Sequence, residues 1–486
     1  MGAYFRFFER RIEKMLAEDA ARGVRPAGPE QDDPALSGGR IRDRRQLVPA
    51  LGLREYWYPA LPIKRVPKNK PLYWRMLGDE IAFFRTRDGS IGAVSDVCPH
   101  RGASMSRGFC FYKGTISCPY HGATFDESGK CKAFLPEGPE SKMEELLTIK
   151  HYPTRVLRGW VFVWMGEDAP APIEEDVPPE LFEGEEGKTH FLTTYTYWRS
   201  NWMVAIENQG DSHNYFYAHR NSLMQLTANR TRPRTPVGAR SKLINDRALF
   251  PLHKEASYYA DDSGVEPYQL YYPGVDGHWP IGQWRRWLWT LFKPWNALVY
   301  NKWRMRNFYK STEEWASDPG IAGWHLPCMV RVNFGAYTLT RYSVAVTENL
   351  SRIVYFHHRR KAGWAIARLI QKLWFHCYFN WWLHYNFSAQ DGDVAAPCRY
   401  WTPENLSSTD SHLMMLRKLV TERSRDVLRR KREAAPGAPP PGTEQELFEQ
   451  KKDSGNVIAT SLAEAASRTE AVSTLGFVTG GLRKNR

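Results

Sequence analysis

Two short motifs constrain this chain more than any other part of its sequence. Cys98-Pro-His100-Arg-Gly and Cys118-Pro-Tyr-His121-Gly each supply one thiolate and one imidazole. That donor set suits a two-iron cluster with two cysteines on one iron and two histidines on the other, which has a higher reduction potential than an all-cysteine cluster. A structural zinc site is the alternative, but zinc modules usually pair like ligands, CxxC with HxxxH. The interleaved order therefore favours the iron–sulfur cluster.

The residues around these motifs resemble the Rieske domain of ring-hydroxylating oxygenases. The similar segments are Tyr56-Trp57-Tyr58-Pro59-Ala60, Leu77-Gly78-Asp79-Glu80-Ile81, Phe84-Arg85 and Asp88-Gly89 before the first motif, and Thr124-Phe125-Asp126 and Gly129 after the second. Such domains usually carry a tryptophan after the second His-Gly pair, where this chain has Ala123. The resemblance implies that Cys98, His100, Cys118 and His121 bind a [2Fe-2S] cluster.

The resemblance also implies an α+β fold class, with an N-terminal antiparallel β Rieske domain followed by a catalytic domain of mixed antiparallel sheet and helices, helix-grip-like in form. A chain of 486 residues can hold both domains and two tails. We expect an N-terminal helix and flexible lead at 1–50, the Rieske domain at 51–165, the mononuclear iron catalytic domain at 189–424 and a disordered tail at 425–486. The acidic, proline-rich stretch 168–188 is typical of a linker.

Local patterns predict several elements of the catalytic domain. Thr193–Trp198 is expected to form a strand, and Asn201–His219 is expected to be mainly helical. Residues 337–348 and 353–358 predict a hairpin. The aromatic-rich stretch 362–388 predicts one long helix.

A second metal-binding pattern begins this domain: Asn201-Trp202-Met-Val-Ala-Ile-Glu207-Asn208-Gln-Gly-Asp211-Ser-His213-Asn214-Tyr-Phe-Tyr-Ala-His219. It resembles the family motif Glu-Asn-x-x-Asp-x-x-His-x4-His, which supplies two histidine ligands of a mononuclear Fe(II). His219 matches the second ligand. The gap-free alignment puts Asn214 at the first position, so the first ligand is either His213, through a local bulge, or Asn214, unless the site is impaired. Imidazole binds ferrous iron better than a carboxamide, which favours His213.

The third ligand in this family is an aspartate from a late helix, often in a Gln-Asp pair. Ser388-Ala-Gln390-Asp391-Gly-Asp393 follows the aromatic stretch and matches in position and order. Asp391 is the expected ligand, Asp393 is the nearby alternative, and an Asp-Gly turn at a helix end is the structural interpretation.

Asp211 has a separate role by resemblance. In such enzymes this aspartate connects a cluster histidine of the neighbouring subunit, here His121, with a histidine of the mononuclear site. A carboxylate can accept from both ring N–H groups and so fix both tautomers. This role implies a ring-shaped oligomer, expected to be a homotrimer. Glu207 and Asn208 are expected to support the helix without contacting iron.

The charge and composition of the chain limit the kinds of molecule that it is expected to bind. The chain has 67 Lys and Arg against 53 Asp and Glu, a net charge of +14, and an acidic electron donor fits that balance. No nucleic-acid-binding module is recognisable. The basic, tryptophan-rich segment 284–306 suits either a membrane surface or, as we favour, a flap over the core or a subunit interface. Seven cysteines are too few for a disulfide scaffold, and no secretory signal or spanning segment is recognisable, so a cytoplasmic location is expected.

These features predict the terminal oxygenase of a multicomponent Rieske system. No dinucleotide-binding fingerprint is present, so electrons would come from a separate ferredoxin or flavin reductase. With O₂ as co-substrate, an apolar, ring-containing substrate would be hydroxylated, dihydroxylated or demethylated. The alternatives are a Rieske electron-transfer protein with an impaired mononuclear site and a membrane-peripheral lipid- or sterol-type oxygenase.

Overall fold

The computed structural model describes residues 47–182, 189–210, 218–219, 238–244, 247–254, 322–333, 337–379, 383, 388–398, 404–406 and 410–434. The predicted helix in 1–50 and the segment 284–306 lie outside these residues. The chain divides into two compact units, Met1–Leu428 and Arg429–Arg486, and the fold below is that of the first.

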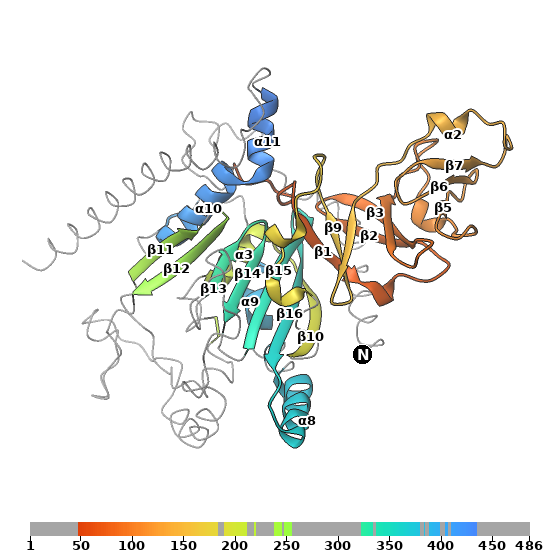
Figure 1. Cartoon of the computed structure of the whole chain (residues 1–486). Coiled ribbons are helices and arrows are strands. Elements are labelled where there is room, and N and C mark those ends of the chain that lie inside the picture. The colour runs from red at the N-terminus through yellow and green to blue at the C-terminus, as the bar shows by residue number, and fades with distance from the viewer. Residues whose placement is uncertain are drawn as a thin grey trace, which may run out of the picture. The chain divides into compact units, whose positions relative to one another are not determined.

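The first domain consists of three small antiparallel sheets, ordered β1-β9-β8, β2-β3-β4 and β5-β6-β7 (Figure 1). Their strands are β1 Trp57–Pro62, β2 Leu72–Met76, β3 Asp79–Arg85, β4 Ile91–Ser95, β5 Ile116–Ser117, β6 Ala123–Phe125, β7 Cys131–Phe134, β8 Thr154–Leu157 and β9 Trp160–Trp164. The short helices are η2 Ile63–Arg65, η3 Met105–Arg107 and α2 Met143–Leu146. The antiparallel β character expected of the N-terminal domain is therefore confirmed.

The turn between β3 and β4 shows how the sequence forms these hairpins. Gly89 has φ +89°, a conformation that costs glycine little. Asp88 accepts a hydrogen bond from the backbone N–H of Ser90 at 3.1 Å. The Asp-Gly pair therefore reverses the chain between two runs of apolar residues.

The second domain is built on one seven-stranded antiparallel sheet in the order β10-β16-β15-β14-β13-β12-β11. The strands are β10 Thr189–Trp198, β11 Gly238–Ile244, β12 Ala248–Lys254, β13 Ala322–His325, β14 Met329–Asn333, β15 Tyr337–Thr347 and β16 Leu350–Arg360. The predicted strand at 193–198 and the predicted hairpin of β15 and β16 are both present. Side chains of β15 and β16 are buried on both faces of the sheet.

The helices described in this domain have between 7 and 13 residues. They are α3 Trp202–Gly210, α8 Ala365–Leu373, α9 Ala389–Ala395, α10 Ser411–Arg423 and α11 Arg425–Ala434, with a π-helical turn, η9, at Trp374–Phe379. Of the long helix predicted over 362–388, residues 365–379 are helical, with the change to π-helical geometry at Trp374, and most of 380–387 lies outside the described residues. The tail predicted from residue 425 begins with a helix. None of the described helices is long and apolar enough to cross a bilayer.

One continuous core joins the base of the first domain to the large sheet. Trp160 and Phe162 of β9 pack against Phe356 of β16, with ring centroids 5.2 and 6.1 Å apart. The backbone N–H of Leu77 donates to the carbonyl of Ala345 at 2.8 Å. A smaller, separate core lies beneath the two Cys/His motifs.

The stretch expected to be a linker is packed into this core instead. It contains η4 Ile173–Glu175 and η5 Pro179–Leu181, and Glu180 is fully buried. Glu180 accepts from Nε of Arg331 at 2.8 Å and from the hydroxyl of Thr340 at 2.9 Å. Burial alone would raise the pKa of Glu180, but Arg331 holds that pKa below the usual range of a glutamate. Glu180 of this stretch, like Asp176, which pairs with Arg425 at 2.9 Å, is thus a buried and paired carboxylate, whereas Asp168 and Glu174 are exposed.

Glu180→Gln is expected to lower the free energy of unfolding by about 3–5 kcal/mol, because the buried Arg331 would lose its ion pair with Glu180. Glu167→Gln is the matched control, since Glu167 pairs with Lys150 at the surface, where a pair contributes about 0–1 kcal/mol. Urea unfolding of both variants measures the difference, and equal losses would contradict it. Because the folded pKa of Glu180 is depressed, its stabilisation is present above the unfolded pKa of about 4.3 and is lost as the pH falls through the folded value.

Candidate functional site

The two Cys/His motifs fold into two loops with the same backbone hydrogen bonds. In the first, the N–H of Cys98 donates to the carbonyl of Ala103 at 2.9 Å, and the N–H of Gly102 returns to Cys98 at 2.8 Å. In the second, the N–H of Cys118 donates to Ala123 at 2.8 Å, and that of Gly122 returns to Cys118 at 3.1 Å. Both glycines have positive φ, +75° and +70°. Each loop can therefore turn tightly enough to present its cysteine and histidine to the same side.

The four predicted cluster ligands are carried by these two loops. Cys98 and Cys118 are buried, while His100 and His121 are half-buried with ring centroids 4.8 Å apart. Burial and the neighbouring Cys118 raise the pKa of the Cys98 thiol to about 11, a value for the loops without a bound cation. Burial and the neighbours His100 and Arg101 hold the pKa of His121 below its usual value, which favours the neutral imidazole that a metal requires.

Among the four predicted cluster ligands, one ring nitrogen has the surroundings expected of a metal-binding atom. Nδ1 of His121 is buried and has no hydrogen-bond partner in the described part of the chain. A buried ring nitrogen without a partner is costly unless it binds something. The donor set, with buried thiols on one side and imidazoles nearer the surface on the other, therefore fits a [2Fe-2S] cluster of the Cys₂His₂ kind.

Ala123 is accommodated where a tryptophan is usual. It is fully buried in β6, directly opposite Phe134 of β7, and belongs to the small core with both cysteines. Phe134 in turn packs edge-on against His100 at 5.3 Å. With alanine at position 123, the ligand loops are thus still packed against the small core.

A second pair of predicted ligands meets in the sheet domain. Nε2 of His219 lies 3.0 Å from Oδ1 of Asp391, and both side chains are almost completely buried. Oδ1 of Asp391 makes no hydrogen bond in the described part of the chain. Two ligand atoms each about 2.1 Å from one metal and at right angles to it would be about 3.0 Å apart. The spacing fits two neighbouring positions on a single metal ion.

Asp391 is positioned by the packing of α9 on the sheet. Ser388, just before α9, shares a 2.6 Å hydrogen bond with the hydroxyl of Tyr355 on β16. Gly392 lies against the indole of Trp198, where a Cβ would be 3.0 Å from Nε1. The guanidinium of Arg341 covers the same indole at 4.4 Å. The carboxylate therefore comes from a helix end fixed on both sides.

Helix α3, which precedes His219 in the sequence, is held in place by a cap at its first turn and by hydrogen bonds near its other end. Asn201 caps the helix by accepting from the N–H of Met203 at 2.9 Å, and its amide donates to the carbonyls of Ala50 and Glu348. Near the other end, Arg341 donates to the carbonyl of Ala205 at 2.7 Å. Trp324 donates to the next carbonyl, Ile206, at 2.8 Å. Trp202 is fully buried and donates to the carbonyl of Pro49 at 2.8 Å, so both residues of the Asn-Trp pair have structural contacts.

The expected supporting role of Glu207 corresponds to an ion pair with α10. It accepts from Nε of Arg417 at 2.5 Å, and the same guanidinium reaches Glu404 at 2.7 Å.

The remaining residues predicted from the sequence are Asp393, Asp211, His213 and Asn214. Asp393 is exposed, whereas Asp391 is buried, so the geometry favours Asp391 as a ligand. Asp211, His213 and Asn214 lie outside the described residues. Within the described part of the chain, no three His, Cys, Asp or Glu side chains converge on one point. Trp198, Arg341 and Tyr355 were missed by sequence reasoning, and only their alternation along strands could have pointed to them.

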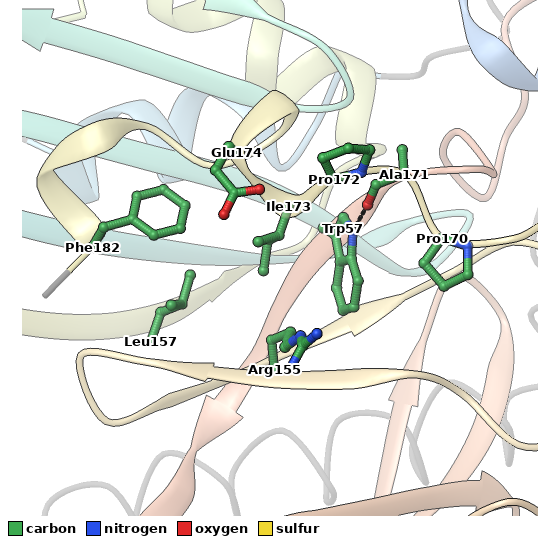
Figure 2. A pocket seen from close by; sticks show the side chains of 9 residues that line it. All are labelled: Trp57, Arg155, Leu157, Pro170, Ala171, Pro172, Ile173, Glu174 and Phe182. Atoms are coloured by element: carbon green, nitrogen blue, oxygen red, sulfur yellow. Dashed lines mark hydrogen bonds between the residues drawn. The ribbon is translucent and has the colours of Figure 1, made fainter.

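A surface hollow of about 550 Å³ lies elsewhere, between Trp57, Arg155 and the segment 170–182 (Figure 2). The indole of Trp57 donates to the carbonyl of Ala171 at its floor. None of the predicted ligands lines this hollow.

Comparison with known proteins agrees with this arrangement. Residues 56–153 match the Rieske [2Fe-2S] domain family. The chain is 33% identical over 178 residues to the terminal oxygenase component CarAa of carbazole 1,9a-dioxygenase from Sphingomonas sp., which covers 36% of this chain and 45% of the relative. It is 30% identical over 191 residues to chloroplastic pheophorbide a oxygenase from Oryza sativa subsp. japonica, covering 37% and 35%. The matched region spans less than half the length of these relatives.

When structures are compared instead of sequences, the similarity covers most of the chain. The terminal oxygenase of carbazole 1,9a-dioxygenase from Novosphingobium sp. KA1 superposes with a TM-score of 0.58 at 22% identity, covering 79% of this chain and 96% of that one. The oxygenase in its reduced complex with ferredoxin gives a TM-score of 0.56 at 20% identity, covering 81% and 95%.

A Rieske [2Fe-2S] domain followed by a sheet domain with helices is also the fold of these solved structures, and the expected α+β fold is confirmed. Residues 56–153 belong to the Rieske [2Fe-2S] domain family, and the fold of the chain resembles that of these terminal oxygenases. Its Rieske domain carries the [2Fe-2S] cluster of that domain family.

Gly392→Ala is expected to weaken metal binding at His219 and Asp391 by about tenfold, because the new Cβ pushes the first turn of α9 away from Trp198. Gly363→Ala is the control, since a Cβ there meets nothing within 4 Å. Iron content after dialysis against a graded series of chelator concentrations measures the affinity. Equal retention in the two variants would show that this close contact does not position Asp391.

Proposed function

We propose that this chain is the terminal oxygenase of a multicomponent Rieske system, which oxidises an apolar, ring-containing substrate with O₂. The observation that carries the proposal is the buried 3.0 Å contact between His219 and Asp391, in a chain that also has a Rieske domain. The proposed domains are 51–165 for the cluster and 189–424 for the mononuclear iron.

The proposed ligands are Cys98, His100, Cys118 and His121 for the cluster, and His219, Asp391 and His213 for a mononuclear Fe(II). When bound by two histidines and a carboxylate, ferrous iron supplies open positions at which O₂ is activated. The protein's own part is to hold Asp391, in the first turn of α9, and His219 next to each other and out of water.

Asp211 is the proposed connection between the two centres. It would accept from a ring N–H of the partner subunit's His121 and from a histidine of its own mononuclear site. Both rings would then keep one tautomer, with the remaining nitrogen directed at the metal. This arrangement requires a ring of subunits, proposed to be a homotrimer.

The substrate class is inferred from the sheet face around Asp391. Tyr337, Tyr355 and His357 lie on neighbouring positions of β15 and β16, and Phe375 packs edge-on against His357 at 6.2 Å. Ligand pockets of this kind are mostly apolar, with a few polar groups that fix orientation. Two relatives are named for ring compounds, carbazole and pheophorbide a, and another for tert-butanol. Hydroxylation, dihydroxylation and demethylation all remain within this proposal.

The proposed electron donor is an acidic ferredoxin, reduced by a separate flavin reductase that uses NAD(P)H. Solved relatives include an oxygenase in complex with ferredoxin. The net charge of +14 would attract an acidic carrier. Close to the cluster loops in sequence, Phe109 and Phe111 are exposed and stack at 4.5 Å, which provides an apolar contact. A cytoplasmic location is proposed with these donors.

Asp391→Asn is expected to reduce iron from about three to about two per chain while keeping the EPR signal of the reduced cluster, because a carboxamide replaces the anionic ligand. His219→Ala should behave in the same way. Asp393→Asn is the matched control and should retain all the iron, since Asp393 is exposed. Anaerobically purified protein is analysed for iron and by EPR.

The first histidine position is tested by the same measurements. Loss of the third iron in His213→Ala, but not in Asn214→Ala, would identify His213, and the reverse result would identify Asn214. A wild-type protein with the cluster alone would contradict the oxygenase proposal and leave an electron-transfer protein.

Asp211→Asn is expected to keep both metals and to slow electron transfer between them by about 10–100-fold, because a carboxamide cannot accept from two ring N–H groups in the same way. The measurement is reoxidation of the prereduced cluster by O₂ in a single turnover, followed by its visible absorbance. Asp88→Asn, in the exposed turn between β3 and β4, is the control. An unchanged rate in Asp211→Asn would remove this residue from the electron path.

A further inference from the structure

Helix α8 is an apolar helix that the rest of the described structure does not cover. It follows β16 and projects past the end of that strand (Figure 1). No residue of α8 is buried. Gln371 holds it in place by accepting from the N–H of Ala362 at 2.9 Å and donating to the carbonyl of Arg360 at 2.8 Å. The helix is therefore attached at its polar side chain, with its apolar side chains exposed.

Those apolar side chains form a single stripe. Ile366, Leu369, Ile370 and Leu373 occupy positions i, i+3, i+4 and i+7, and they are 75%, 58%, 61% and 55% exposed. Trp364 precedes the helix and is 83% exposed. This spacing normally marks a face that is buried against another surface. Four large aliphatic residues and an indole in water are a larger apolar patch than single exposed residues would give.

The charge around α8 has one sign. Residues 349–390 contain no aspartate or glutamate, while five basic residues lie on the helix or just before it: Arg359, Arg360, Lys361, Arg368 and Lys372. Arg368 and Lys372 lie one turn apart on the helix and are exposed. An apolar stripe beside basic side chains, with a tryptophan at its end, is the pattern of a helix that lies in a membrane interface.

We propose that α8 docks this protein on the surface of an anionic phospholipid bilayer. Ile366, Leu369, Ile370 and Leu373 would enter the boundary between headgroups and acyl chains, while Arg368 and Lys372 contact phosphate groups. Nine residues of helix extend about 14 Å, less than half of a hydrocarbon core of about 30 Å, so α8 lies on the membrane and does not cross it.

A second copy of the chain fits this face less well. Pairing two α8 stripes face to face would bring two sets of basic side chains together, with no acidic residue between 349 and 390 to balance them. A bilayer with anionic lipids supplies the missing negative charge.

The docking itself does not rest on the proposed function, but one consequence does. The chain runs from α8 through η9 to α9, so the surface helix and Asp391 belong to the same segment. An oxygenase held in this way would take an apolar substrate that dissolves in the membrane.

The test is co-sedimentation of the full-length protein with vesicles of phosphatidylcholine alone and of phosphatidylcholine mixed with phosphatidylglycerol. Wild type is expected to bind the mixed vesicles, and less so in high salt. The double variant Leu369→Asp/Ile370→Asp and the double variant Arg368→Glu/Lys372→Glu are each expected to lower partitioning about tenfold or more. Leu146→Asp is the control, because Leu146 is 72% exposed on α2 and lies outside the proposed surface.

Two results would overturn the proposal: wild type that fails to bind mixed vesicles, or α8 variants that bind them as well as wild type does. Size-exclusion chromatography with light scattering tests the competing occupant. If the α8 variants alter the oligomeric state and leave vesicle binding unchanged, α8 is a subunit interface and the proposal fails. Iron content of the same variants should stay at the wild-type level, so a failure of docking is distinguishable from a failure of the oxygenase proposal.

Discussion

The buried contact between His219 and Asp391 is the constraint around which the sheet domain is organised. Two groups that can both carry charge are costly to hold 3.0 Å apart out of water unless a cation or a proton joins them. The fold meets that demand with rigid supports, namely α3 capped at Asn201 and α9 fixed against Trp198. A metal centre needs ligands held in place before the ion arrives, because a loose site loses affinity. The packing around these two residues makes sense as preparation for a metal.

Buried ion pairs give the same domain its long-range order. Glu180 with Arg331 and Glu207 with Arg417 each join segments that are far apart in the sequence. Such pairs add little net stability when compared with apolar packing, but removing one partner is costly, so they enforce one arrangement. The segment around Glu180 is thereby locked across the sheet, and α10 is locked to α3. Both ion pairs act on elements that precede the proposed metal ligands in the chain.

The sequence predicts what depends on neighbours in the chain. The cluster loops, the β15–β16 hairpin and α3 follow from Cys/His spacing, alternation and capping, and Asp391 follows from a short motif in the expected order. The buried role of Glu180 could not be predicted, because an acidic, proline-rich stretch looks the same whether it faces water or an arginine 151 residues away. Arg341 was missed for the same reason. The displaced His213 shows the limit of motif spacing, since one residue of register decides between two ligand types.

Residues 362–388 show that composition alone does not separate a core helix from a surface one. Both are rich in large apolar and aromatic side chains, and only the position of the charges differs. Here the basic residues lie on or just before the first nine helical residues, whose apolar stripe is exposed, whereas Phe375, in the following π-helical turn, is buried. The segment thus changes from a surface helix to core packing before it reaches Asp391. If α8 lies on a bilayer, a substrate that leaves the lipid follows a single stretch of chain to the proposed iron. It would then meet the apolar face of the sheet without crossing water.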